Sequence, residues 1–365
     1  MKILLVTATD KLVEKFSALN PELEYCAAVV DNVDSAKEIL SKVPLYPMSE
    51  LQNCVESLQY DYVLCVQNAF YEGLLTRIKK CGLSTKKVIG FADLPGLGNF
   101  KQDRLLRYYQ ANAAKIEMFI TGISPTEAGI DIRQFKCNAI NLAASSQDLY
   151  YDFSIAKFVM NEGKKYGKLR YALIGIAPYS FHFDLSRTYG FQTRMLPFFI
   201  AFNDLHNFHM PASIYKKFFR EEWLAKKVSI EKLAINGVNR NEVMDISSDK
   251  GLNPWKGKYY PETRAENVKI FEDYLVLCDE NNIRPIMTIV PTTEKYMATF
   301  DKRLLEDFYS IIEQALLNHP AARFVDGWKW GGVTYDDFYN HAHLNIHGET
   351  KFSKYLNEFI EQLER

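Results

Sequence analysis

The sequence has few cysteines and no pair of them in a C-x-x-C pattern. Its six cysteines are scattered along the chain, mostly within apolar runs. This placement favours buried free thiols in a reducing compartment over a disulfide framework or a zinc site. No apolar run approaches the ~20 residues that a membrane span needs, and the first one is too short for the core of a signal peptide. We therefore expect a cytoplasmic protein with no membrane span.

An excess of charge of either sign is also missing. The 44 Lys and Arg residues are balanced by 45 Asp and Glu residues, which gives a net charge of −1. Nothing in this balance attracts nucleic acid or an anionic membrane, so we expect no nucleic-acid partner. The hydrophobic content of 47% is typical of a globular protein, and the length of 365 residues predicts two domains.

The first part of the chain alternates between apolar runs and helical segments. The predicted strands are residues 2–8, 25–30, 43–47, 60–67 and 87–91, and the predicted helices are residues 10–19, 35–42, 48–57 (from a Ser49 cap) and 72–81. This alternation predicts a small doubly wound parallel sheet in a domain of residues 1–98, which ends in the turn-rich stretch 93–99.

The first strand-to-helix turn contains no glycine. A dinucleotide-binding domain carries G-x-G-x-x-G there, and residues 7–11 lack this phosphate cradle. Asp31 stands near the position of a ribose-binding acid, but acidic strand ends are common, so nucleotide binding stays open and we predict no cofactor. By its order of elements, and by residues 43–46 and 60–64, the segment resembles the Rossmann-like N-terminal domains of some sugar-modifying acetyltransferases.

The α/β alternation restarts after residue 99. The predicted strands are residues 117–122, 137–142, 168–176, 284–290 and 322–326, and the predicted helices are residues 101–114, 148–162, 261–281, 302–318 and 348–363. Another helix is expected to start near Glu127. Residues 189–258 are rich in aromatic and basic side chains and interrupt the alternation of strands and helices, which indicates a helical insertion or lid. We therefore predict a second, three-layer α/β/α domain over residues 99–365.

Four polar motifs stand at strand ends or before the last helix. They are Gly122-Ile123-Ser124, Asn141 to Ser146, Ala177-Pro178-Tyr179-Ser180, and Asn340-x-x-His343-Leu344-Asn345. By these motifs, the chain from about residue 116 to its end resembles the SGNH (GDSL-type) hydrolase superfamily. The resemblance is strongest to the branch that includes the D-alanyl-lipoteichoic acid modification protein and glycan O-acyltransferases.

This resemblance implies a role for each motif. Ser124 is the implied nucleophile, and its backbone N–H and that of Ser146, which stands in place of a family glycine, would form an oxyanion hole. Asn141 opens the second motif, and Gln147 after it resembles the glycan-modifying branch. Tyr179 stands where the family has an oxyanion-binding asparagine, and its hydroxyl could donate instead.

The same residues also fit ordinary structural roles. Ser124 could cap a helix, with Pro125 at the first helical position and Glu127 completing a capping box. Tyr179 could be a core tyrosine whose hydroxyl is satisfied locally. Residues 147–151 could be an ordinary helix cap with aromatic side chains packed beside it.

His343 is the implied general base, but the acid expected three residues before it is Asn340. In serine proteases an Asp→Asn change at this point costs about 10⁴ in rate, because it favours the wrong tautomer of the histidine. Asn340 therefore predicts a slow enzyme, or another acid in its place, for which Asp336 and Asp337 are the candidates.

The resemblance implies a serine-dependent O-acyltransferase or O-acetylesterase. Its partners would be an acyl donor and a carbohydrate or surface-glycan precursor, such as an intracellular precursor or a nucleotide sugar. One alternative is a catalytically degenerate glycan-binding or scaffold protein of a polysaccharide biosynthesis system. A metal site formed by His341 and His343 with Asp336 or Asp337 is a further alternative, but their spacing does not fix a full ligand set, and we predict no metal.

Overall fold

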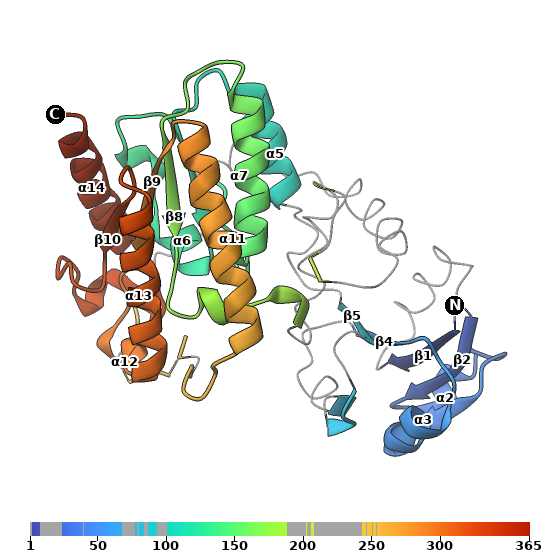
Figure 1. Cartoon of the computed structure of the whole chain (residues 1–365). Helices are drawn as coiled ribbons and strands as arrows, with labels where there is room; N and C mark the ends of the chain where they lie inside the picture. Colours follow the sequence, from blue (N-terminus) through green and yellow to red (C-terminus); the bar gives the residue numbers. More distant parts are fainter. Residues whose placement is uncertain are drawn as a thin grey trace. The chain divides into compact units, whose positions relative to one another are not determined.

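The computed structural model forms two compact units, residues Met1–Lys101 with Leu185–Val228, and residues Gln102–Asp184 with Ser229–Arg365 (Figure 1). The described residues are 2–7, 24–38, 40–67, 77–78, 80–83, 87–92, 101–187, 202, 206–207, 243–245, 247–249, 251–252 and 254–365. Among them, no helix is long and apolar enough to cross a membrane.

The first unit contains a five-stranded parallel sheet in the order β3-β2-β1-β4-β5. Its strands lie close to the predicted ones and are β1 (Lys2–Thr7), β2 (Glu24–Val30), β3 (Leu45–Pro47), β4 (Tyr62–Gln67) and β5 (Val88–Ala92). β1 is buried from its second residue onward, as expected for an apolar central strand of a parallel sheet.

The described helices of this unit differ from the predicted ones at their starts. α2 (Val33–Ala36) begins at the N-cap Asn32, whose side chain accepts the N–H groups of Asp34 and Ser35. The predicted Ser49 cap is wrong, because a 3₁₀ turn, η1 (Met48–Glu50), leads into α3 (Leu51–Ser57) without a side-chain cap. The predicted helix 10–19, most of helix 72–81, the turn 93–99 and most of the insertion 189–258 lie outside the described residues.

The second unit has its own five-stranded parallel sheet, in the order β10-β9-β8-β6-β7. Its strands are β6 (Met118–Gly122), β7 (Ala139–Asn141), β8 (Tyr171–Gly175), β9 (Arg284–Ile289) and β10 (Arg323–Asp326). Its longer helices are α5 (Lys101–Asn112), α7 (Leu149–Gly163), α11 (Pro261–Glu280), α13 (Lys302–Asn318) and α14 (Ile346–Leu363). The predicted α/β class is confirmed.

Helices cover both faces of this sheet. Met118 and Ile120 of β6 pack in one cluster with Phe352 of α14. The intervening Thr121 points to the opposite face, where its hydroxyl hydrogen-bonds with Tyr274 of α11 at 3.0 Å, and α11 packs beside α7 (Figure 1). Because alternate side chains of a strand face opposite sides, this pattern gives a three-layer α/β/α arrangement.

The strand order fixes where a site can form. The chain runs from β6 to β7 on one side and then crosses to β8 on the other side of β6. In open α/β sheets, the carboxyl ends of the strands at such a switch point open a crevice. Ser124 follows β6 at this edge of the sheet.

Candidate active site

The turn after β6 is shaped by two glycines. Gly122 has a φ of 141°, a backbone conformation that L side chains rarely adopt. A Cβ atom on it would lie 2.7 Å from the carbonyl oxygen of Gly175, the last residue of β8. The close approach of β6 and β8 therefore requires glycine here, and the chain leaves β6 in a sharp turn that leads directly into Ser124.

Ser124 is not the helix cap that a capping box would require. It is the first residue of α6 (Ser124–Gly129), while the N-cap is Ile123, with no side-chain cap hydrogen bond. The Glu127 side chain instead accepts a hydrogen bond from the Ser145 hydroxyl at 2.7 Å. The capping-box interpretation is wrong, and the Ser124 hydroxyl has a different partner.

That partner is His343, which lies on a short hairpin that the sequence did not predict. β11 (Phe338–Asn340) pairs antiparallel with β12 (His343–Leu344) just before α14. Asn345, at the N-cap of α14, accepts hydrogen bonds from the N–H groups of His347 and Gly348. The two asparagines of the motif therefore have different roles. Asn345 caps α14, whereas Asn340 faces His343.

The structure brings Ser124, His343 and Asn340 into one hydrogen-bonded line. His343 Nε2 lies 3.0 Å from Ser124 Oγ, and His343 Nδ1 lies 2.8 Å from Asn340 Oδ1. Both distances fall within the range of about 2.6–3.2 Å expected between a nucleophile, its base and the group that orients the base. Ser124 and His343 are half-buried and Asn340 is buried.

The orientation of the Asn340 amide sets the tautomer of His343. Asn340 Oδ1 accepts the backbone N–H of Ala342 at 3.0 Å, so the atom that faces the imidazole is the oxygen. Nδ1 of His343 must then carry a proton to make its 2.8 Å contact with that oxygen. In a neutral imidazole this leaves the lone pair on Nε2, where it can accept the Ser124 proton. Asn340 therefore imposes the tautomer that a general base needs.

A separate segment packs against this loop and holds it in place. A Cβ atom on Gly251, whose φ is 85°, would lie 2.5 Å from Asn340 Oδ1, so the backbone there fits closely over the amide. The buried His341 faces the carbonyl oxygen of Ser248 with Nε2 at 2.8 Å and the hydroxyl of Thr293 with Nδ1 at 2.8 Å. His341 thus joins Ser248, and Thr293 at the N-cap of α12 (Glu294–Met297), to the hairpin.

Asp336 and Asp337 were the acids expected to take the place of an aspartate at position 340. Asp337 is buried and accepts hydrogen bonds from the N–H and hydroxyl of Thr334, and it pairs with Lys351 of α14 at 2.8 Å. Asp336 is exposed. Since the ring nitrogens of His341 and His343 also face protein groups, these four residues are not arranged as a metal-ligand set.

We expect Asp337→Asn to lower the free energy of unfolding by about 2 kcal/mol, because the buried side chain loses its charge and one of its two acceptor oxygens for the Thr334 and Lys351 donors. The reactivity of Ser124 in the folded variant should stay within about twofold of wild type, since Asp337 acts on Thr334 and Lys351. Urea unfolding and the rate of labelling by a fluorophosphonate measure the two effects. Asp336→Asn is the matched control, and slower labelling at unchanged stability in Asp337→Asn would show that Asp337 serves the base.

The side chains of the second motif, Asn141 to Ser146, and of Gln147 after it serve mainly structural roles. Asn141, the last residue of β7, donates to the Ile130 carbonyl at 3.3 Å and accepts the Ala143 N–H at 3.0 Å, so its side chain is used locally. Ser146 has a φ of 63°, the left-handed conformation that favours glycine, which agrees with the glycine expected at this position from the sequence resemblance. Gln147 is buried, and its amide groups bond to other side chains within the unit.

Tyr179 lies in an aromatic cluster that adjoins the site. Its ring stacks on Trp255 with centroids 4.2 Å apart and lies parallel to Phe300. Burial, and then the neighbouring Tyr296 hydroxyl, hold the pKa of Tyr179 well above its ordinary value. Tyr179 is therefore a buried core tyrosine, as in the structural alternative, and not an exposed residue beside Ser124. The same cluster includes Ile123 and Ala342, the residues that precede Ser124 and His343.

One backbone N–H group at the turn is available to a bound ligand. Within the described part of the chain, the Ser124 N–H makes no hydrogen bond, and it lies in the first turn of α6, where N–H groups have no helical partner. A donor of this kind can hold the negative oxygen of a tetrahedral intermediate. The oxyanion-binding role that the resemblance implies for the Ser146 N–H stays a prediction.

A scan against protein-family models and a search of the curated proteins each found no match to this chain.

Proposed function

We propose that the chain is a serine-dependent O-acyltransferase or O-acetylesterase that acts on a carbohydrate or glycan precursor. The observation that carries the proposal is the line of Ser124, His343 and Asn340, in which the lone pair of His343 Nε2 faces the nucleophile at 3.0 Å. The carbohydrate substrate is proposed from the sequence motifs and their resemblance to the glycan-modifying branch.

In this mechanism Ser124 Oγ attacks the acyl carbonyl carbon of the donor. His343 Nε2 takes the hydroxyl proton, and the carbonyl oxygen becomes an oxyanion next to the Ser124 N–H. The intermediate collapses when the bond to the leaving oxygen breaks, and the imidazolium returns its proton to that oxygen. The acyl group is then bound to Ser124 as an ester.

A second half-reaction releases the acyl group. A hydroxyl of a sugar, or water, gives its proton to His343 and attacks the acyl carbon of the acyl-enzyme. The bond between Ser124 Oγ and the acyl carbon then breaks, and the imidazolium returns the proton to Ser124 Oγ, which releases the new ester or the free acid. The choice between transfer and hydrolysis depends on which acceptor reaches the site. Asn340 contributes an amide dipole to the imidazolium where a carboxylate would contribute a full charge, so the proposal predicts a slower base than an Asp-containing triad.

We expect a fluorophosphonate probe to label wild-type protein at Ser124, and Ser124→Ala to abolish labelling while the fold is kept. The matched control is Ser310→Ala, which changes an exposed serine on α13 and should label as wild type does. Mass spectrometry of the labelled peptide identifies the site. If folded wild-type protein stays unlabelled at high probe concentration, the proposal of a serine-dependent enzyme is contradicted, and a binding or scaffold function is favoured.

The acceptor is tested with p-nitrophenyl acetate as donor. An acyltransferase should release nitrophenol faster when a sugar is added, and acetylated sugar should appear in the mass spectrum. An esterase should release it at a rate that the sugar does not change. Ser124→Ala serves as the background in both assays.

A further inference from the structure

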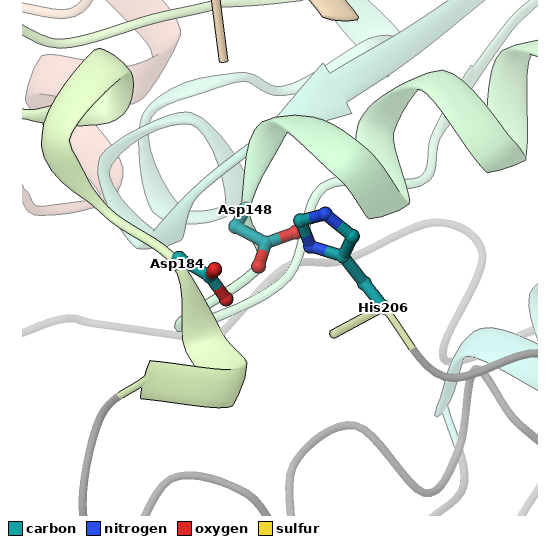
Figure 2. Close-up of side chains that lie close together, drawn as sticks. All are labelled: Asp148, Asp184 and His206. Carbon is teal, nitrogen blue, oxygen red and sulfur yellow. The ribbon is translucent and has the colours of Figure 1, made fainter. Parts of the chain in front are cut away.

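The second unit buries several ionisable side chains besides those of the proposed triad. Two of them, Asp148 at the N-cap of α7 and Asp184, bring their carboxylates within 4.8 Å of each other (Figure 2). Another, His341, is completely buried. It follows Asn340 directly and precedes His343 by two residues, so the bonds of its side chain also bear on the position of the proposed base.

The two ring nitrogens of His341 have opposite roles. Nε2 lies 2.8 Å from the carbonyl oxygen of Ser248, which can only accept, so Nε2 carries the proton. In the neutral ring Nδ1 then has the lone pair, and it accepts the hydroxyl proton of Thr293 at 2.8 Å. The Thr293 oxygen in turn accepts the N–H of Tyr296 at 3.3 Å, so α12 orients this hydroxyl. His341 therefore has the opposite tautomer to the one that His343 needs.

The two partners of the His341 ring belong to segments that are also joined to each other. Asp249, next to Ser248, pairs with Lys295 of α12 at 2.6 Å, and Thr293 is the N-cap of that helix. Both members of the ion pair are exposed, so by itself it contributes little to stability. The N–H of Thr293 also donates to the carbonyl oxygen of His341 at 3.1 Å. Ser248 and Thr293 thus form a frame that holds the His341 ring from two sides.

The bonds of Asn340 act in a different way from those of His341. The two hydrogen bonds of Asn340 Oδ1, at 3.0 and 2.8 Å, lie within the loop itself. A shift of the whole loop would keep both of them and still carry His343 away from Ser124. The side chain of His341 instead reaches out of the loop to the frame on two sides, so it opposes such a shift.

We propose that His341 is a positioning residue for the proposed base, because its two ring bonds fix the loop so that His343 stays in line with Ser124. The inference rests on the proposed function, since it concerns the geometry of the same Ser124–His343 pair. His341 takes no proton in the reaction, because its Nδ1 lone pair is occupied by the hydroxyl of Thr293. A displacement of about 1 Å costs about 10²-fold in rate at such a site, and the bond from Ser124 Oγ to His343 Nε2 is 3.0 Å long.

Two variants of His341 each keep one of its ring bonds. In His341→Gln the amide nitrogen reaches the position of Nε2 and donates to Ser248, but nothing accepts from Thr293. In His341→Asn the amide oxygen stands near the position of Nδ1 and accepts from Thr293, but no donor reaches Ser248. We expect each variant to slow fluorophosphonate labelling of Ser124 by about tenfold, the effect of one lost hydrogen bond. His341→Leu keeps neither bond and should be slower by about 100-fold.

A double-mutant cycle with Thr293 makes the test specific to the ring bonds. Thr293→Val removes the hydroxyl but keeps the branched shape, so labelling should slow about as much as in His341→Gln, which lacks the acceptor of the same bond. Combined with His341→Gln, Thr293→Val should therefore have little further effect, whereas combined with His341→Asn it should slow labelling by about tenfold again. Thr293→Ser restores the hydroxyl and should recover most of the rate. The lost cap of α12 is common to both backgrounds and cancels in the cycle.

His319 provides a matched control for His341→Leu. It is also a buried histidine, and its ring nitrogens lie 2.5 Å from Asp279 and 3.1 Å from Glu272 of α11. His319→Leu therefore removes two ring bonds as well, and urea unfolding should show a loss of stability like that of His341→Leu. Labelling of folded His319→Leu should stay within about twofold of wild type, since these bonds join α11 and not the hairpin. Equal slowing in both variants would overturn the inference.

A second readout observes the Ser124–His343 bond without any reaction. The ¹⁵N chemical shift of an unprotonated ring nitrogen changes when that nitrogen accepts a hydrogen bond, so His343 Nε2 should give different shifts in wild type and in Ser124→Ala. The measurement uses ¹⁵N-labelled histidine at a pH at which the ring is neutral, and the signal is assigned as the one missing from His343→Gln. In His341→Leu the Nε2 shift should move most of the way to the Ser124→Ala value, and in His319→Leu it should stay at the wild-type value.

The outcomes separate this inference from the proposed function. If wild type is not labelled but the Nε2 shift depends on Ser124 and His341 as expected, the acyl-transfer proposal fails and the positioning role of His341 stands. If wild type is labelled and the Gln and Asn variants of His341 label equally fast, the positioning role is overturned and the proposed function stands. A wild-type Nε2 shift equal to that of Ser124→Ala would overturn both. Where His341→Leu does not fold, the Gln and Asn variants and the Thr293 cycle decide the result.

Discussion

Replacing Asn340 by leucine is expected to slow the labelling of Ser124 by about 10³-fold or more. Leucine has the same branched arrangement of heavy atoms but no oxygen, so it cannot accept the proton on His343 Nδ1 or the N–H of Ala342. The imidazole can then take the tautomer with its proton on Nε2, which cannot accept the Ser124 proton, and a wrong tautomer costs about 10⁴ in a serine protease. The rate of fluorophosphonate labelling, with thermal unfolding to verify the fold, measures this loss.

Asn340→Asp is the informative partner of this variant. A carboxylate keeps the acceptor that faces Nδ1 and adds a charge that stabilises the imidazolium, so labelling should become about tenfold faster. This gain is far smaller than 10⁴ because the asparagine already imposes the correct tautomer. If Asn340→Leu were to label at the wild-type rate, Asn340 would not orient the base, and the hydrogen-bonded line would have no catalytic meaning.

Gly175→Ala is expected to reduce the free energy of unfolding by about 3 kcal/mol, because the new methyl group has no space. Its Cβ would lie 1.9 Å from Thr126 Oγ1 and 2.5 Å from Thr126 Cγ2. Thr126 belongs to α6, and its N–H bonds to the carbonyl oxygen of Ile123, so a forced shift of Thr126 also displaces Ser124. Urea unfolding should show the loss of stability, and labelling of the remaining folded protein should be slower.

A double variant and a matched glycine make this test specific. Adding Thr126→Ala to Gly175→Ala removes the two closest atoms and should recover part of the stability, although the Thr126 Cβ position, 2.6 Å away, still crowds the methyl group. Gly167→Ala meets no atom within 4 Å but has a φ of 59°, so only about 1 kcal/mol of backbone strain is expected. Equal losses at Gly167 and Gly175 would show that the clash with Thr126 is not the cause.

The architecture was predictable because each central strand is a continuous apolar run between turn signals. All five residues of β6 and all five of β8 are buried, as expected for parallel strands with helices on both faces. The placement of Ser124 also follows from the sequence, since Gly122-x-Ser124 stands directly after such a run. These features depend on local pattern, and the sequence contains that pattern in full.

The rest of the site depends on contacts between distant residues. The strands that hold Asn340 and His343 are three and two residues long, too short to leave a period in the sequence. The tautomer of His343 depends on which atom of Asn340 the Ala342 N–H meets, and a sequence records no amide orientation. From the third motif, Tyr179 was expected at the position of an oxyanion-binding asparagine. Its ring instead stacks on Trp255 and lies parallel to Phe300, contacts that the motif does not encode.

The hairpin that holds His343 also determines when Ser124, the proposed nucleophile, meets its proposed base during folding. Ser124 and His343 are 219 residues apart in the chain, so their contact closes one of the longest loops of the second unit. Contacts of such long sequence separation form late, because the entropy of loop closure opposes them until the intervening structure is in place. During synthesis Ser124 is made long before its base exists. Under the proposed mechanism, Ser124 therefore stays a weak nucleophile until the hairpin and α14 have packed in place, and labelling of Ser124 would report that the second unit has finished folding.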